Sequence, residues 1–240
     1  MSETASVDPS TTRLGVECSP TRTTPDSAAA PPGVARGVEH YVGARVAGLQ
    51  NALLDRSHRS HSATVATLAR LRRTQPGDVS DSASWDVVFN GMSPELVGRG
   101  DNPSPAERAI HAALLLYAGH AQSADGPRHI RGRRLGHAIG DLARADSPEA
   151  YAEGAVARRF RAFASATTWV SAVRHLRGLI SLMRSHGIGL DYGALAADLY
   201  RIQHPEGLRR VRLQWARDFH HIPARPATDS PPIDSTEQEN

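Results

Sequence analysis

The spacing of apolar residues constrains the fold most, because it repeats at the helical period through almost all of residues 36–222. No run in this region alternates apolar and polar residues as a half-buried strand does. The sequence therefore predicts an all-α fold, a helical bundle of about eight helices with a small N-terminal part and a larger C-terminal bundle. The helices are expected over residues 36–55, 60–73, 104–122, 132–145, 148–164, 167–186, 191–203 and 206–221.

Several of these helices begin at residues that favour helix starts. The segment "NPSPAERA" places Ser104 at the N-cap and Glu107 three residues into the helix, which is the capping-box pattern. The segment "DSPEAYAE" repeats the pattern, with Asp146 or Ser147 as the cap. Asp191 is expected to cap the helix that follows "SHGIGL".

Three segments lack this periodicity. Residues 1–35 and 223–240 are rich in Ser, Thr, Pro and Ala or acidic residues, and they are expected to be disordered tails. Residues 74–103 are expected to form an irregular linker within the helical domain 36–222, with one short helix near residues 85–89.

Charge is distributed unevenly along the chain. All 28 basic residues are Arg, and the overall net charge is only +3. The two tails carry net charges of −2 and −3, which leaves +8 on residues 36–222. A basic body between acidic tails favours a polyanionic partner, and the planar guanidinium group suits phosphate.

The sequence argues against several other classes of protein. Cys18 is the only cysteine, so an intramolecular disulfide and a thiolate zinc site are excluded. The N-terminus lacks the pattern of a signal peptide, and "AALLLYA" is too short to span a bilayer, so a cytoplasmic protein without membrane contact is expected.

No residue has the sequence context of a catalytic group. The 12 histidines include the pairs His58 and His61, and His220 and His221, but none has the spacing of a zinc site. Motifs such as GxSxG, GxGxxG and the phosphate-binding P-loop are also missing. We therefore expect no enzyme, no cofactor and no metal site.

The segment "VRHLRGLISLMRS" combines a core-facing helix with basic residues along its edge. Its apolar residues occupy a face of about 120°, and Arg174, Arg177 and Arg184 flank that face. These arginines could pair with acids of neighbouring helices, for which Asp191 and Asp198 are candidates. Alternatively, they could form part of a phosphate-binding surface.

Similar clusters recur before and after this segment, and their recurrence favours a continuous basic surface. They occur in "LARLRR", "RHIRGRRLGHAIGDLAR", "VARRFRAF" and "LRRVRLQWARDF".

The order of the motifs resembles a known family. "LARLRR", "LYAGHAQ", "RRLGHAIGDL", "VARRFRAF", "LRGLISLMRSHGIGLDYGALAADL" and "VRLQWARDFH" occur in sequence over about residues 45–221. This series resembles the CasB-type small subunit of the type I-E CRISPR Cascade complex. The chain departs from that family at Ile202, where a tryptophan is usual, and at His220, where an aromatic residue is usual.

The resemblance implies an all-helical, non-catalytic subunit that stabilises the R-loop of an RNA-guided complex. The implied partners are the target and displaced DNA strands, the crRNA-containing complex with its backbone-forming and large subunits, and a second copy of the chain. It implies nucleic-acid contacts at Arg72, Arg73, Arg158, Arg159, Arg177, Arg209, Arg210 and Arg212. Charge and position alone add Arg108, Arg133, Arg174 and Arg184.

Three other functions are compatible with the sequence. The arginines could meet acidic partner subunits in a protein scaffold, or the chain could be a free-standing helical DNA-binding protein. A metal-dependent nuclease that uses His and Asp has the weakest support, because no ligand motif is present.

Overall fold

The computed structural model describes residues 32–75 and 77–221, and the regular elements in these two ranges are all helical. The α-helices are α1 (Pro32–Leu54), α2 (His61–Leu71), α3 (Trp85–Phe89), α4 (Pro105–His120), α5 (Leu135–Asp146), α6 (Ala155–Ser165), α7 (Trp169–Ser185), α8 (Tyr192–Arg201) and α9 (Pro205–His220). A short 3-10 helix, η1, covers Ser82–Ser84. The predicted all-α fold is confirmed.

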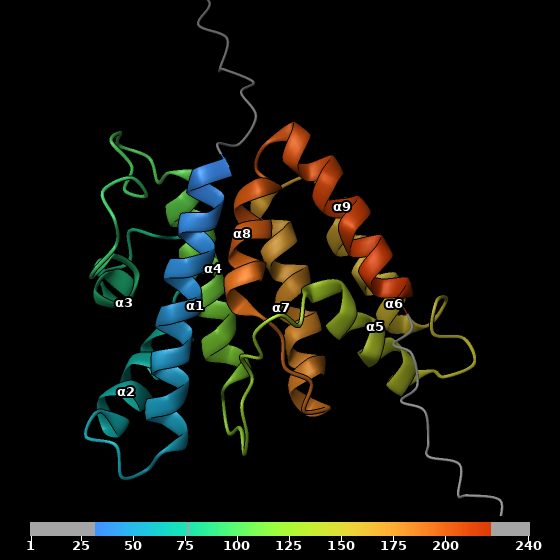
Figure 1. Ribbon diagram of the computed structural model, residues 1–240, viewed down its shortest axis with the longest axis horizontal. Coiled ribbons are helices and arrows are strands. Elements are labelled where there is room, and N and C mark those ends of the chain that lie inside the picture. Colours follow the sequence, from blue (N-terminus) through green and yellow to red (C-terminus); the bar gives the residue numbers. More distant parts are fainter. Residues whose placement is uncertain (1–31, 76, 222–240) are drawn as a thin grey trace, which may run out of the picture.

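Helices α4, α7 and α8 lie in the middle of the bundle (Figure 1). Helix α1 packs along α8 and α4, whereas α5 packs on α9 and α6 packs on α7. One hydrophobic core contains residues from both halves of the chain, including Val38 and Val42 of α1 and Trp215 of α9. The small N-terminal part and the larger C-terminal bundle therefore share a core.

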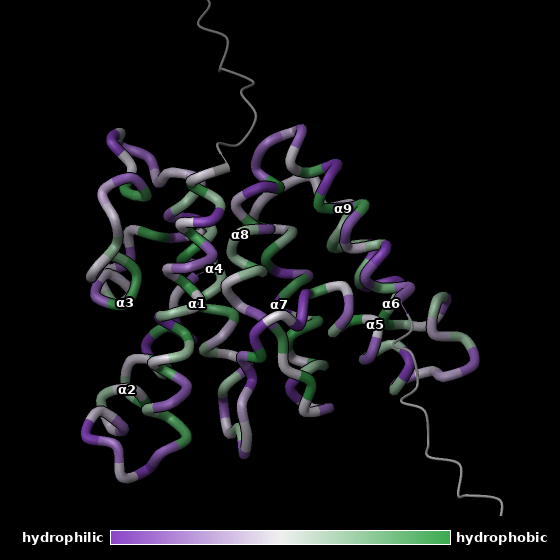
Figure 2. The backbone as a smooth tube through the Cα atoms, in the orientation of Figure 1, coloured by the Kyte–Doolittle hydropathy of each residue, from purple (hydrophilic) through white to green (hydrophobic). Residues whose placement is uncertain are grey.

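Helix α4 is the most buried element. Every residue from Ala109 to Ala118 is at most 1% exposed, including the run of three leucines at 114–116. A helix that is apolar on all sides is stable only when it is surrounded by protein. By contrast, hydrophobic and hydrophilic stretches alternate along α9, as expected of an amphipathic helix with one face on the core (Figure 2).

The predicted starts of α4 and α8 are confirmed. The Ser104 hydroxyl accepts a hydrogen bond from Glu107 N at 3.1 Å, and the Glu107 carboxylate accepts one from Ser104 N at 2.7 Å. Asp191 caps α8 by accepting from Gly193 N at 2.9 Å and Ala194 N at 3.1 Å.

The predicted start of the helix after Pro148 is wrong. Helix α5 continues to Asp146, residues 148–154 form turns, and α6 begins only at Ala155, with Gly154 at the N-cap. The amides of Glu153 and Gly154 both donate to Ala150 O at 2.9 Å, which closes the turn. Because the amphipathic face of α6 starts at Val156, a helix over the preceding residues would have had little apolar surface to bury.

Residues 74–103 are mostly turns, and the short helix predicted there is present as α3. Helix α1 begins at Pro32, so residues 32–35, which were expected to belong to the tail, form its first turn. The predictions of disorder for residues 1–31 and 223–240 concern segments outside the described residues.

Candidate nucleic-acid interface

Helix α7 has the core-facing apolar face and the flanking arginines that the sequence predicts. Its residues Val173, Leu176, Leu179, Ile180 and Met183 are buried in the core. Along the flank, Arg177 and Arg184 are partly buried and Arg174 is exposed.

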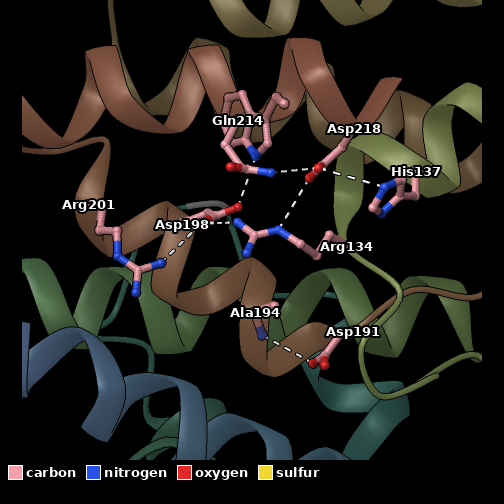
Figure 3. A network of polar contacts seen from close by, with 9 residues as sticks. Arg134, His137, Asp191, Ala194, Asp198, Arg201, Gln214 and Asp218 are labelled. Atoms are coloured by element: carbon pink, nitrogen blue, oxygen red, sulfur yellow. Dashed lines mark hydrogen bonds and ion pairs between the residues drawn. The ribbon is translucent and has the colours of Figure 1, made fainter. Parts of the chain in front are cut away.

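The two acids proposed as partners of these arginines form hydrogen bonds and ion pairs with other residues instead. Asp191 caps α8 and also accepts from Gly132 N at 2.7 Å. Asp198 pairs with Arg201 at 3.1 Å and with Arg134 at 3.6 Å, as Figure 3 shows. Among the described residues, no carboxylate lies within ion-pair distance of the arginines on α7.

Two of these arginines meet a third one, from a distant part of the sequence, at a cavity. Arg177 and Arg184 of α7 and Arg72 from the end of α2 line a space of about 230 Å³ between α7 and α4. The remaining lining residues are Leu115, Leu116, Gly119, Gln122, Ile180 and Ser181, so the lining contains no acid. We call this site the arginine cavity.

Backbone carbonyls near the C-terminal ends of two helices position the three guanidinium groups. Arg177 donates to Arg72 O at 3.1 Å, just after α2. Arg72 donates to Ala118 O at 3.4 Å, and Arg184 donates to Gly119 O at 3.4 Å, both at the end of α4. Such carbonyls lack helical partners and carry partial negative charge, so they attract cations.

These contacts leave most of the hydrogen-bonding capacity of the cavity unused. Each guanidinium has five N–H donors. Counting the bond from Arg184 to Gln122 Oε1 at 3.1 Å, the three groups make four hydrogen bonds to described residues. Burial lowers the pKa of Arg72, and the nearby charges of Arg73 and Arg184 lower it further. The site therefore concentrates positive charge and donors without an internal anion, which is the chemistry that binds phosphate.

The other predicted contact residues do not all converge on this site. Arg73, Arg158, Arg159, Arg174 and Arg210 are exposed on α6, α7, α9 and the segment after α2. Arg158 donates to Glu153 O at 2.8 Å.

Arg108 and Arg212 line a second pocket, at the other end of α4. Two further predicted residues are neutralised by acids. Arg133 pairs with Asp141 at 2.6 Å, and Arg209 pairs with Glu206 at 2.7 Å. Burial tends to raise the pKa of Asp141, but the hydrogen bonds from Arg133 and Arg144 outweigh this effect and lower the pKa.

Sequence reasoning missed a buried charge network between α5, α8 and α9. Arg134 lies between two buried carboxylates, Asp198 and Asp218, and its Nε is 3.2 Å from Asp218 (Figure 3). Trp215 Nε1 donates to Asp198 at 2.9 Å, and Gln214 donates to Asp218 at 2.6 Å. Asp218 lies three residues after Trp215, on the core side of α9. Because a buried acid needs a charged or hydrogen-bonding partner, its position in the sequence could have indicated this network.

The histidines occupy separate environments. His120 is fully buried and its Nδ1 is 2.8 Å from the Tyr192 hydroxyl, whereas His61 Nδ1 is 3.0 Å from Ala52 O. Within residues 32–75 and 77–221, no group of three or more His, Cys, Asp or Glu side chains is placed to hold a metal ion. None of the described helices is long and apolar enough to cross a membrane.

Comparison with known proteins assigns the chain to a family. The family described as "CRISPR-associated protein Cse2" matches residues 67–220, which run from the end of α2 through α9 and include all three arginines of the cavity. The chain belongs to the Cse2 family. The resemblance to CasB-type small subunits that the sequence motifs indicated is thereby confirmed.

Two solved structures resemble this Cse2-family chain. CasB from Thermobifida fusca is 32% identical with a TM-score of 0.63, and the match covers 77% of this chain and 98% of that one. A Cse2-family CRISPR-associated protein from Thermus thermophilus is 24% identical with a TM-score of 0.52, covers 76% and 96%, and shares the fold. No match is found among curated protein sequences.

Proposed function

We propose that this Cse2-family chain is the non-catalytic small subunit of a cytoplasmic type I-E CRISPR RNA-guided surveillance complex. Its role is to hold the nucleic-acid backbone and so stabilise the R-loop while the target is bound. In such complexes, pairing with the guide RNA selects the sequence, and the protein needs only to recognise backbone and shape. The proposed partners are the target and displaced DNA strands, the crRNA-containing complex with its backbone-forming and large subunits, and a second copy of the chain.

The arginine cavity is the observation that carries this proposal. Three guanidinium groups lie around one small space without a carboxylate, and most of their donors are unused by the described residues. Like charges that are partly buried repel one another, and an anion bound between them offsets this repulsion. A phosphodiester supplies one negative charge shared by two non-bridging oxygens, and both oxygens can accept hydrogen bonds from guanidinium groups.

Ten of the twelve predicted contact residues lie outside the second pocket, which Arg108 and Arg212 line, and these ten should contribute unequally. Those of the arginine cavity, Arg72, Arg177 and Arg184, should contribute most. The exposed arginines Arg73, Arg158, Arg159, Arg174 and Arg210 should add weaker, screened attraction. Arg133 and Arg209 should contribute least, because Asp141 and Glu206 already neutralise them.

The test compares assembled complexes that carry either the natural chain or a chain with Arg72→Gln, Arg177→Gln and Arg184→Gln. We expect the variant to assemble with the same subunit stoichiometry and to release target DNA faster, which is measured as the lifetime of the R-loop. An unchanged lifetime in a fully assembled complex would overturn the proposal. Loss of the subunit from the complex would instead mean that these arginines meet acidic partner surfaces.

A further inference from the structure

A second pocket differs in chemistry from the arginine cavity. It measures about 550 Å³, a size typical of small-molecule sites, and lies where the N-terminal ends of α4 and α7 meet α6, α8 and α9. Its lining combines the rings of Phe163, Trp169 and Trp215 with the polar side chains of Arg108, Gln203 and Arg212, and it contains no acid. We call this site the aromatic pocket.

The side chains of the aromatic pocket differ in how firmly they are held. Phe163 and Trp215 are each 2% exposed and form part of the core, whereas Trp169 is only partly buried. Gln203 is fixed by donating to Pro105 O at 2.8 Å and Leu199 O at 3.0 Å. Its Oε1 accepts from Arg108 Nε at 2.8 Å, so Gln203 orients the guanidinium while the terminal nitrogens of Arg108 make no hydrogen bond to a described residue.

Two further donors at the pocket lack acceptors. Arg212 Nε and Trp169 Nε1 are buried, and neither has a hydrogen-bond partner among the described residues. Both atoms are covered by protein, so an occupant of the pocket would meet the Trp169 ring and the terminal guanidinium nitrogens of Arg212 rather than these two atoms. The pocket thus presents two cations, unpaired donors and an aromatic ring, and these features favour an anion attached to a flat ring.

We propose that the aromatic pocket takes one unstacked nucleotide of a single strand, with its base against Trp169 and its phosphate on Arg108 and Arg212. Aromatic side chains stack on bases of any sequence, but only where the base is free of its own helix. A paired duplex keeps its bases stacked inside, so the pocket would favour single-stranded over double-stranded nucleic acid. This inference rests on the proposed function, since the same strand must reach both sites.

The two sites are arranged along the same pair of helices. Arg108 at the aromatic pocket and Gly119 at the arginine cavity are eleven residues apart on α4, which is about three turns on the same face and about 16 Å. On α7, Trp169 precedes Arg177 by eight residues, or about 12 Å. A strand held by its phosphates at the arginine cavity can therefore reach the aromatic pocket within a few nucleotides.

The experiment uses the full chain and two probes, a single-stranded oligothymidylate and an abasic phosphodiester of the same length. The natural chain should bind the oligothymidylate about tenfold more tightly, because one stacked base adds to a shared backbone contact. Trp169→Leu should bind both probes equally, at the affinity of the abasic probe, and Trp169→Phe should restore part of the preference. Trp85→Leu is the matched control, because Trp85 is 50% exposed on α3 and lines neither site.

The outcomes show which of the two proposals fails. Tight binding of both probes with no preference for bases would overturn the aromatic pocket and leave the arginine cavity intact. The same base preference in Trp169→Leu, with an unchanged melting temperature, would also overturn it. Binding of neither probe at low salt would overturn both proposals and would point to a protein side chain as the occupant. Arg177→Gln should weaken binding of both probes by the same factor and preserve their ratio.

Discussion

Arginine side chains from α7 donate hydrogen bonds to backbone carbonyls at the C-terminal ends of α2 and α4. Arg177 reaches Arg72 O, and Arg184 reaches Gly119 O, so cations lie where helix carbonyls are unpaired. These contacts hold the guanidinium groups before any ligand arrives. Because less side-chain freedom remains to be lost on binding, the site is preorganised for an anion.

The clearest residue-level prediction concerns Arg177. Arg177→Gln should weaken binding of single-stranded DNA by the isolated chain about tenfold, since a charged hydrogen bond to phosphate is removed. The free energy of unfolding should change by less than about 0.5 kcal/mol, because relief of charge repulsion offsets the missing bond to Arg72 O. Filter binding and urea unfolding measure the two quantities.

Arg209→Gln is the control for that change. Its side chain is 76% exposed and paired with Glu206, so its removal should alter affinity by less than about twofold. An equal reduction in affinity for the two variants would mean that the cavity has no special role.

A second residue-level prediction concerns pH. Burial, together with the nearby charge of Arg128, lowers the pKa of His120 from 6.5 to about 3. His120 therefore binds a proton below about pH 6.5 in the unfolded chain but only near pH 3 in the folded chain. The free energy of unfolding consequently falls as the pH falls through this range. At pH 5, this residue alone should reduce the free energy of unfolding by about 2 kcal/mol.

Urea unfolding at pH 7 and pH 5 tests this prediction. Burial also lowers the pKa of His111 and His129, so the natural chain should lose more than this amount. The His120→Gln variant should lose about 2 kcal/mol less than the natural chain between the two pH values. His175→Gln, at an exposed position on α7, should behave like the natural chain, and an undiminished loss in His120→Gln would contradict the prediction.

At the level of elements, caps recognised in the sequence can be tested by matched substitutions. Ser104→Ala removes the side-chain acceptor of the capping box of α4 and should cost about 1 kcal/mol of stability. Ser60 occupies the N-cap of α2 without a side-chain cap hydrogen bond, so Ser60→Ala should cost less than about 0.3 kcal/mol. Thermal unfolding of both variants measures the difference, and equal costs would show that the cap contributes little.

Close packing of α1 against α8 depends on a glycine. A Cβ added at Gly193 would lie 2.6 Å from Glu39 O, so the two helices must separate to accept it. Gly193→Ala should therefore cost about 1–3 kcal/mol. In Gly178→Ala, the added carbon meets open space within α7, and the better helix former should stabilise the fold by about 0.5–1 kcal/mol. Destabilisation by both variants, measured in urea, would contradict this packing argument.

The same elements show how far local sequence patterns predict structure. The core face of α7 follows from its periodicity, and the start of α4 follows from Ser104 and Glu107. The residues from Asp146 to Pro148 match a helix N-cap pattern, but no large apolar face follows them directly. Helix α5 therefore continues to Asp146, and α6 begins only at Ala155. A cap pattern indicates a helix only when burial supports the helix that follows.

At the level of the whole molecule, the site depends on contacts that no local pattern contains. Arg72 and Arg177 are 105 residues apart in sequence, yet one donates to the backbone of the other. The sequence indicated that both belong to basic clusters and that Arg177 flanks the core face of its helix. It could not show that Asp191 and Asp198 are occupied elsewhere, which is what leaves the arginines of α7 without acids among the described residues.

The most direct test of the central claim is the salt dependence of DNA binding by the full chain. The logarithm of the affinity is plotted against the logarithm of salt concentration for the natural chain, for the variant with Arg72→Gln, Arg177→Gln and Arg184→Gln, and for Arg209→Gln. We predict that the slope of the triple variant becomes shallower by about 0.7–0.9 for each phosphate that the variant no longer neutralises, while Arg209→Gln keeps the natural slope. A triple variant with the natural slope and the natural affinity would contradict the claim that the arginine cavity holds phosphate.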